Sequence, residues 1–149
     1  MPFDNMTFNE VLAYIAGFFD GEGTFCFRKA QATRPVPAVC AVQKDVAVLL
    51  EIKDFLMRAF GIDVGVYYIK SNRCWSLAAN KRKDVLLLCS VLYPYLIVKK
   101  KQAAGLIEFI NLRLEEGRSG TDNVDKENEL VSTVCRLNGG RFYHAGVRH

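Results

Sequence analysis

The sequence predicts an α+β fold, in which an antiparallel β-sheet is covered on one face by helices. Segments with apolar residues at helical spacing alternate along the chain with short segments of period two. The period-two segments come in two pairs, each joined by a turn, and a helical segment separates the pairs. Strands joined by short turns pair antiparallel, so we expect two β-hairpins with helices packed on them.

The expected elements follow the order α-β-β-α-β-β-α-α-α. The first helix is capped by Thr7 or Asn9 and runs to about Asp20, and a period of two begins at Thr24. The turn region QATRPVP contains two prolines, which bar regular pairing, so the returning strand is expected to start at Ala38. The other elements are a helix at 46–60, strands at 64–69 and 74–79, and helices at 83–92, 99–114 and 125 to about 138.

Length and composition indicate one domain of ordinary globular character. The chain has 149 residues, of which 50% are hydrophobic and 24% charged, with a net charge of +4. A mildly basic balance permits a polyanionic partner without requiring one. We expect residues 1–118 to form the core, and residues 119–149 to add a C-terminal helix and a basic arm to the same domain.

Neither a membrane protein nor a secreted one is predicted. The longest apolar runs fall short of the roughly 20 residues that cross a bilayer, and the N-terminus lacks the pattern of a secretion or transit signal. The five cysteines are widely spaced and odd in number, which disfavours both a disulfide scaffold and a zinc site. We therefore expect reduced thiols and an intracellular protein, in the cytoplasm of a prokaryote or inside an organelle, with no membrane partner and no small-molecule substrate.

Alternation along the strands predicts one apolar and one polar face of the sheet. The helix-covered face is expected to hold Phe25, Phe27, Tyr67, Ile69, Trp75 and Leu77. The opposite face is expected to hold Thr24, Cys26, Arg28, Tyr68, Lys70 and Ser76, with Arg34 and Arg73 at the hairpin ends. This face carries no acidic residue, so it is either simply solvated or placed in the major groove of DNA, where a two-stranded ribbon fits.

The first helix carries a stripe of small residues that ends in two carboxylates. Ala13, Ala16, Gly17 and Asp20 share this stripe, and small residues allow a second helix to approach closely. Glycine inside a helix costs on the order of 1 kcal/mol relative to alanine, so Gly17 favours such a contact over an ordinary core packing.

In the segment Asp20-Gly21-Glu22-Gly23, the two acids cannot point the same way on a continuing helix. The glycines let the helix end here, which leaves carbonyl oxygens without helical partners. A carboxylate beside such a carbonyl is a hard-oxygen site suited to Mg²⁺, although two acids in a loop can also have no function.

Three segments of the sequence, YIAGFFDGEG, AVQKD and LYPYLIVKKKQA, stand in this order along the chain. The first resembles the motif of the LAGLIDADG homing endonucleases, a family of intron- or intein-associated DNA-cutting enzymes. The second is similar to that family's strand-end glutamine, and the third to a later segment of the family. The resemblance covers roughly residues 9–114 and implies the αββαββα fold of the family, in which an antiparallel DNA-binding sheet forms a saddle, with C-terminal helices added.

The resemblance implies roles for single residues. Glu22 matches the metal-binding carboxylate, with the Gly21 carbonyl beside it. Asp20 matches the first acid of the motif, which mainly secures the helix junction, and we also expect Asp20 among the metal-binding and catalytic residues. Gln43 matches a residue that positions solvent, and Lys99 the basic residue near the scissile phosphate. Two departures stand out: many relatives have Asp where Glu22 stands, and some have a basic residue at the position of Ala47, for which Lys44 is the available substitute.

The resemblance also implies partners and a cofactor. We expect Mg²⁺, with Mn²⁺ or Ca²⁺ able to occupy the same sites, and a long, nearly palindromic double-stranded DNA site as substrate. Because the sequence has one motif, a symmetric homodimer is expected, packed along Ala13, Ala16, Gly17 and Asp20. The residues expected to contact DNA are Thr24, Cys26, Arg28, Arg34, Ala38, Cys40, Tyr68, Lys70, Arg73, Ser76, Lys81, Arg82, Lys101 and Arg141.

Three alternatives to the nuclease stay open at the level of sequence. The same fold can serve as a maturase that binds intron RNA and assists splicing, or as a DNA-binding protein without catalysis. The third alternative is an unrelated α+β protein with a chance motif. The basic segment after Asn138 is either an arm along the DNA backbone or a frayed tail.

Overall fold

The computed structural model describes residues 3–29, 34–116, 123–140, 143–144 and 147–148. The helices are α1 (Phe8–Glu22), α2 (Val46–Phe60), α3 (Arg82–Leu92), α4 (Lys100–Glu116) and α5 (Val124–Leu137), with a 3-10 turn, η1 (Tyr93–Tyr95). The strands are β1 (Gly23–Lys29), β2 (Pro35–Gln43), β3 (Gly65–Ile69), β4 (Cys74–Ala79), β5 (Tyr143–His144) and β6 (Val147–Arg148). The expected order of elements is confirmed, with two short strands added at its end.

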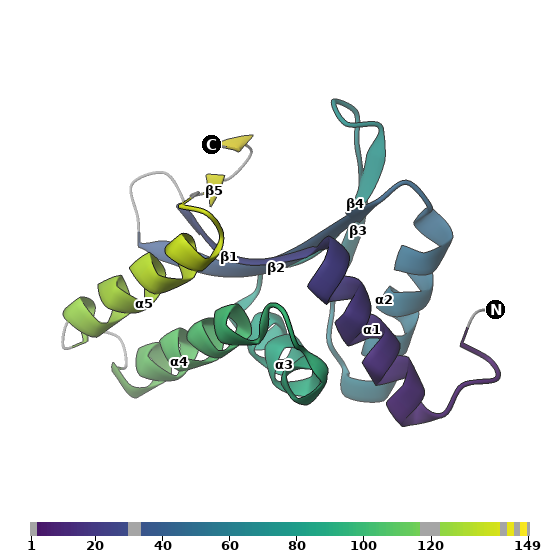
Figure 1. Cartoon of the computed structure of the whole chain (residues 1–149), viewed down its shortest axis with the longest axis horizontal. Helices are drawn as coiled ribbons and strands as arrows, with labels where there is room; N and C mark the ends of the chain where they lie inside the picture. The colour runs from purple at the N-terminus through teal and green to yellow at the C-terminus, as the bar shows by residue number, and fades with distance from the viewer. Residues whose placement is uncertain (1–2, 30–33, 117–122, 141–142, 145–146, 149) are drawn as a thin grey trace.

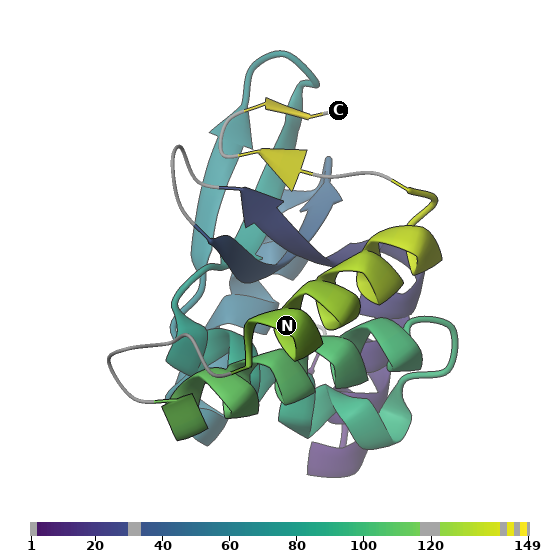
Figure 2. The same cartoon turned by 90° about the vertical axis from the view of Figure 1, so that its left-hand side faces the viewer.

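The molecule has two layers, with the helices on one side of the sheet (Figures 1 and 2). The strand order is β3-β4-β2-β1-β5-β6, and the first four strands pair antiparallel. No helix of the described residues covers the other side of the sheet, which is concave between the β3–β4 hairpin at one end and β5 at the other (Figure 1). The predicted α+β class with an antiparallel sheet is therefore confirmed.

Local signals in the sequence account for several helix ends. Thr7 forms a capping box with Glu10: its hydroxyl accepts from the Glu10 N–H at 3.2 Å, and its N–H donates to Oε1 of Glu10 at 2.9 Å. Asp45 caps α2 by accepting from the Ala47 N–H. Gly61 ends α2 with a φ of +67°, a left-handed conformation that glycine adopts without strain.

The two prolines do not interrupt β2, contrary to the prediction. Pro35 pairs with Lys29 and Pro37 with Phe27, so β2 begins at Pro35 and not at Ala38. Proline is excluded from a strand only where its missing N–H would face a partner. Pairing with β4 begins at Val39, so at both prolines β2 has a strand on one side only among its described pairings.

We call the side of the sheet that bears the helices the covered face and the other side the open face. Phe25, Phe27 and Leu77 lie on the covered face, in the hydrophobic core, as predicted. The open face consists of Thr24, Cys26, Arg28, Val36, Ala38, Cys40, Val42, Gly65, Tyr67, Ile69, Cys74, Ser76 and Ala78, because residues paired directly opposite share a face.

The predicted alternation of β3 is wrong by one residue. Val66 pairs with Leu77 and Tyr68 with Trp75, so Val66 and Tyr68 lie on the covered side. The rings of Tyr68 and Trp75 meet edge to face, 5.2 Å apart between centroids. Tyr67 and Ile69 therefore belong to the open face, and Tyr68 does not.

The C-terminal helix packs into the same core as the rest of the chain. Val131 and Val134 of α5 are buried with α4 residues, and the Asn138 side chain donates to the Phe25 carbonyl of β1 at 2.8 Å. The described residues beyond it form β5, which pairs parallel with β1, and β6, so these residues extend the sheet in place of the predicted free arm or frayed tail. None of the described helices has the length and apolar character needed to cross a membrane.

Candidate functional site

The C-terminal end of α1 meets the sheet where β1 begins, and a glycine makes this junction possible. Gly23 terminates the helix with an extended conformation, and its N–H donates to the Phe19 carbonyl. A Cβ at Gly23 would lie 2.6 Å from Cδ1 and 2.7 Å from the carbonyl oxygen of Phe19, which is itself fully buried. Only glycine lets the chain turn from helix to strand this tightly, and this turn places Asp20, Gly21 and Glu22 directly before β1, a strand in the interior of the sheet.

Asp20 joins the end of α1 to the beginning of α4. Its carboxylate accepts from the backbone N–H of Ile97 at 2.8 Å and from that of Lys99 at 3.0 Å. Lys99 immediately precedes α4, so Asp20 acts as a helix cap supplied from another element, and its charge also suits the positive end of the helix dipole. Since both oxygens are engaged by N–H groups, the structure favours the junction role predicted for Asp20 over a metal-binding one.

The Lys99 side chain lies against the same junction. Its ammonium donates to the carbonyl oxygens of Phe19, at 3.4 Å, and of Gly23. Burial lowers the pKa of Lys99, while the nearby Asp20, Glu22 and Cys40 act on this pKa in the opposite direction. The structure thus brings Lys99 and both acids of the motif to one place, although they are far apart in the sequence.

Glu22 and Gly21 are exposed at the last turn of α1. The last carbonyls of a helix have no intrahelical partner, so an exposed carboxylate and a carbonyl oxygen occur side by side here. Both are hard oxygen donors of the kind that Mg²⁺ takes. Within the described residues no three Asp, Glu, His or Cys side chains group as metal ligands.

Gln43 lies at the end of β2, half-buried, opposite Trp75. Its side-chain oxygen accepts from the N–H of Lys44 at 2.8 Å, which leaves its amide N–H groups to point elsewhere. A recess of about 320 Å³ lies next to the α1 junction, lined by Gly23, Thr24, Val98, Lys99, Gln102, Leu137 and Asn138.

The predicted DNA contacts divide by exposure. Thr24, Arg28 and Cys40 are partly exposed on the open face, and the guanidinium of Arg28 donates to the Asn80 side chain at 3.0 Å. The basic residues at the strand and helix ends are exposed: Lys70, Arg73, Lys81, Arg82 and Lys101. Arg141 lies outside the described residues.

Three predicted contacts lie on the open face but are buried. The exposed fractions are 3% for Cys26, 0% for Ala38 and 4% for Ser76. Ser76 is flanked in its row by the larger side chains of Tyr67 and Val42, which explains its burial. Direct contact between these three side chains and a duplex is therefore not supported.

Arg34 forms an ion pair with Glu127 of α5, which the sequence analysis did not predict. Its guanidinium lies 2.5 Å from Oε2 of Glu127 in α5, and Nε of Arg113 lies 3.2 Å from Oε1 of the same buried carboxylate. This pairing places Arg34 in the helix layer and not on the open face. Glu127 looked like an ordinary acid in the first turn of a helix, so no local signal marked it.

The outward side of α1 differs in one position from the predicted stripe. Ala13 and Gly17 are exposed, Asp20 is half-buried, and Ala16 is fully buried in the core of its own chain. Apart from the backbone of α1 and the adjacent residues, no atom of the described residues lies within 4 Å of a Cβ added to Gly17 or Gly21. The exposed stripe is therefore Ala13-Gly17-Gly21, and Ala16 does not belong to it.

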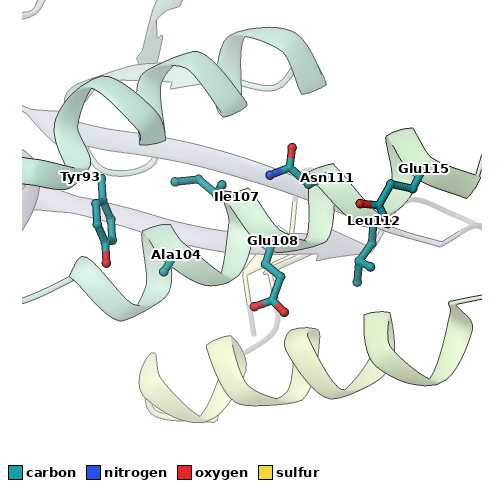
Figure 3. Close-up of a pocket in the computed structure, with 7 residues that line it drawn as sticks. All are labelled: Tyr93, Ala104, Ile107, Glu108, Asn111, Leu112 and Glu115. Carbon is teal, nitrogen blue, oxygen red and sulfur yellow. The ribbon is translucent and has the colours of Figure 1, made fainter.

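A groove of about 480 Å³ lies elsewhere, along α4 in the helix layer (Figure 3). It is lined by Tyr93, Ala104, Ile107, Glu108, Asn111, Leu112 and Glu115, and its two carboxylates would repel a nucleic acid. None of the predicted site residues contributes to it, so the end of α1 is the better candidate site.

Comparison with known proteins places this geometry in context. The sequence matches no protein-family model and has no significant match among curated proteins. Its structure is similar to that of the homing endonuclease I-CvuI, solved in complex with DNA in the presence of Mg, with a TM-score of 0.72, 18% identity and coverage of 85% of this chain and 81% of that one. The archaeal intron-encoded homing endonuclease I-Vdi141I, solved in complex with DNA, gives a TM-score of 0.73 and 23% identity over 87% and 84% of the two chains.

The structure is also similar to that of a longer chain, the LAGLIDADG meganuclease I-AabMI, which was solved bound to uncleaved DNA. It gives a TM-score of 0.67 and 18% identity, and the match covers 93% of this chain but 51% of that one. The present chain therefore corresponds to most of I-CvuI and I-Vdi141I and to about half of I-AabMI. From its helices, its sheet and these matches, the chain has the fold of the LAGLIDADG homing endonucleases.

Proposed function

We propose that the protein is a site-specific homing endonuclease, which hydrolyses both strands of a long, pseudo-palindromic DNA duplex bound across the open face. The observation that carries this proposal is the convergence of Asp20, Glu22 and Lys99 at the end of α1, beside the open face. A duplex lying on that face brings a phosphate to these side chains. The solved neighbours in complex with DNA support the binding of a duplex.

Glu22 and the Gly21 carbonyl would hold a divalent ion, with Mg²⁺ as the natural occupant and Mn²⁺ or Ca²⁺ able to replace it. When bound, such ions stabilise charge on the attacking and leaving oxygens of a phosphodiester. Neighbouring structures solved with Mg and with Ca support this choice of metal. Water and phosphate oxygens, together with a second chain, would complete the coordination.

The remaining residues of the site orient and stabilise. The amide of Gln43 would position the attacking water, because its oxygen is already held by the Lys44 N–H and its N–H groups are directed by that bond. The Lys99 ammonium would stabilise charge on the phosphate in the transition state. Asp20 would fix the position of Lys99 relative to the end of α1, because its carboxylate accepts from the backbone N–H groups of Ile97 and Lys99.

A homodimer packed along α1 would bring two such sites to one duplex. Gly17 supports it, because no close contact among the described residues explains a glycine at this exposed position in a helix. The flank formed by α1 and α2 also exposes large apolar side chains, namely Phe8, Tyr14, Leu50 and Met57. A two-fold dimer would match a palindromic site.

A cleavage assay tests the proposal. The purified protein is incubated with Mg²⁺ and a plasmid library that carries candidate insertion sites. One of these sites joins the two DNA sequences that flank the gene, as they would be without the inserted intron or intein that contains it. We expect double-strand cuts that EDTA abolishes. The variant Glu22→Gln should still bind the cut site but not cleave it, and full activity in that variant would show that the metal ligand is misassigned.

The alternatives give different results in the same experiment. A maturase would bind intron RNA in preference to the duplex, and a catalytically silent protein would retain the duplex without cutting it. A monomer with no salt-dependent DNA binding would refute the proposal altogether. An enzyme that cuts this DNA would act in the compartment that contains its target, which is a prokaryotic cytoplasm or an organelle.

A further inference from the structure

The open face presents few groups that can form hydrogen bonds with bases. Of its described side chains, Arg28 alone is charged, and that guanidinium already donates to Asn80. The large side chains of β2 and β3 that are exposed on this face are apolar or aromatic. Tyr67 of β3 is 44% exposed, and Val42 and Val36 of β2 are 37% and 36% exposed. A sheet that reads bases by hydrogen bonds would instead present Arg, Asn, Gln or Lys.

One row of this face crosses three strands. Tyr67 of β3 pairs with Ser76 of β4, and Ser76 is followed in the same direction by Val42 of β2. Ser76 is buried between them, so the surface of the row consists of the Tyr67 ring and the Val42 methyl groups. A Cβ at Gly65 would lie 3.5 Å from Cε1 of Tyr67, so the ring leans along the sheet over Gly65 and does not stand clear of it.

Basic side chains surround this apolar row at the ends of the strands. The exposed ones are Lys44 after β2, Lys70 and Arg73 in the β3–β4 turn, and Lys81 and Arg82 after β4. The open face carries no Asp or Glu among its described residues. An apolar centre inside a basic rim fits a duplex, with phosphates at the rim and the major groove over the centre.

Thymine is the base that offers an apolar group there, since its C5 methyl lies in the major groove, where the other bases show donors and acceptors. We propose that the open face selects its target through apolar contacts of Val42 and Tyr67 with thymine methyl groups, so that the DNA sites it binds have thymine at the base steps these residues cover. This inference rests on the proposed binding of a duplex and specifies which duplexes are bound.

The test begins with selection of duplexes from a randomised library by the full chain, in EDTA so that cleavage does not intervene. We expect thymine to be strongly enriched at two symmetric pairs of positions, one pair at the bases that Val42 covers and one at the bases that Tyr67 covers. At each of them dT is then replaced by dU, which removes only the methyl group and leaves every hydrogen bond of the base pair. Loss of one buried methyl should weaken binding about fourfold per site. Replacing dC by 5-methyl-dC at the same positions, in a duplex selected with cytosine there, should strengthen binding by a similar factor.

Two variants connect the effect to the row. Val42→Thr keeps the shape of the side chain but replaces a methyl group with a hydroxyl, so the dT/dU ratio of affinities should fall to about one at its position. Leu87→Thr removes a similarly exposed apolar group from α3, in the helix layer, and should leave the ratio unchanged. Thermal unfolding of both variants checks that each is folded.

The outcomes separate this inference from the proposed function. Selected sites without thymine enrichment, or equal binding of dT and dU duplexes, overturn the inference while leaving an endonuclease that reads its target by other contacts. An unchanged ratio in Val42→Thr also overturns it. If the chain retains no duplex even at low salt, both the inference and the proposed function fail.

Discussion

Replacing Gly17 by alanine should have opposite effects on the single chain and on its dimer. Gly17 lies within α1 and its φ is not positive, and a Cβ there would meet no atom within 4 Å among the part of the chain that the structure describes, apart from the helix's own backbone and the adjacent residues. Alanine in a helix interior is about 1 kcal/mol more favourable than glycine. The isolated chain should therefore gain about 1 kcal/mol in its free energy of unfolding, which corresponds to a rise in Tm of about 2–4 °C for a protein of this size.

In a dimer packed along α1, the same methyl group would enter the contact between the two helices. Overpacking of a close contact costs about 1–3 kcal/mol, so the dissociation constant of the dimer should rise about 5- to 150-fold. The two effects have opposite signs because one arises within the chain and the other between chains.

Sedimentation velocity over a range of protein concentrations measures the association, and urea unfolding of a dilute sample measures the stability of the chain. Ser132→Ala is a matched control, since it raises helix propensity on the exposed side of α5 and should leave association unchanged. If Gly17→Ala stabilises the chain but leaves self-association as it was, α1 does not form the interface, and the proposed arrangement of the two sites is wrong.

Three further changes test the junction at the end of α1 and the packing of α5. Asp20→Asn removes the charge and places an amide N–H group against a backbone N–H, so urea unfolding should show a loss of about 1–3 kcal/mol; a loss below that range would mean that this cap contributes little. Burial lowers the pKa of Lys99, so the cleavage rate should fall with rising pH before an exposed lysine would lose its proton. In Lys99→Arg the guanidinium stays charged and this alkaline fall should disappear, whereas it should persist in the exposed control Lys126→Arg; persistence in both would exclude Lys99 as its source. Gly105→Ala would place a Cβ 2.5 Å from Cγ2 of Val134 and should destabilise the chain by about 1–3 kcal/mol, and an unchanged Tm would show that α5 can move away from α4.

The order of elements could be predicted from the sequence because local signals set it. Period, caps and stop residues are read within a few residues, and Thr7, Asp45 and Gly61 act in the structure as the sequence indicated. The prolines of β2 misled for a reason that is not local: whether a strand tolerates proline depends on where its second neighbour begins to pair, and β4 begins to pair at Val39.

The faces of β3 could not be decided by alternation alone. In the segment VYYI both central residues are tyrosines, and an amphipathic ring is equally at home on either side of a sheet. The pairing of Val66 with Leu77 decides the matter, and this pairing depends on β4. Short strands with similar residues on both faces obtain their register from their partners.

The candidate site was predicted in part from the residues and in part from a resemblance. The segment Asp20-Gly21-Glu22-Gly23 predicts that the helix ends at about Asp20, with Gly21 already outside it. In the structure α1 instead continues through Gly21 to Glu22 and ends only at Gly23, so both acids lie on the last turn of the helix. The contact of Lys99 with the Gly23 carbonyl joins residues that are 76 positions apart in the sequence, and no periodicity could reveal it. The pairing of Arg34 with Glu127 was missed for the same reason.

The separation of the open face from the core has a consequence for how such a protein can change its target. Val36, Val42 and Tyr67 support no helix packing, so replacing them should alter stability by no more than about 0.5 kcal/mol. Ala38 and Cys26, fully or almost fully buried on the same face, leave no room for larger side chains. New base preferences can therefore evolve at the exposed positions Val36, Val42 and Tyr67 without loss of the fold. The buried positions Ala38 and Cys26 cannot change in this way, so they stay constant beneath the exposed side chains.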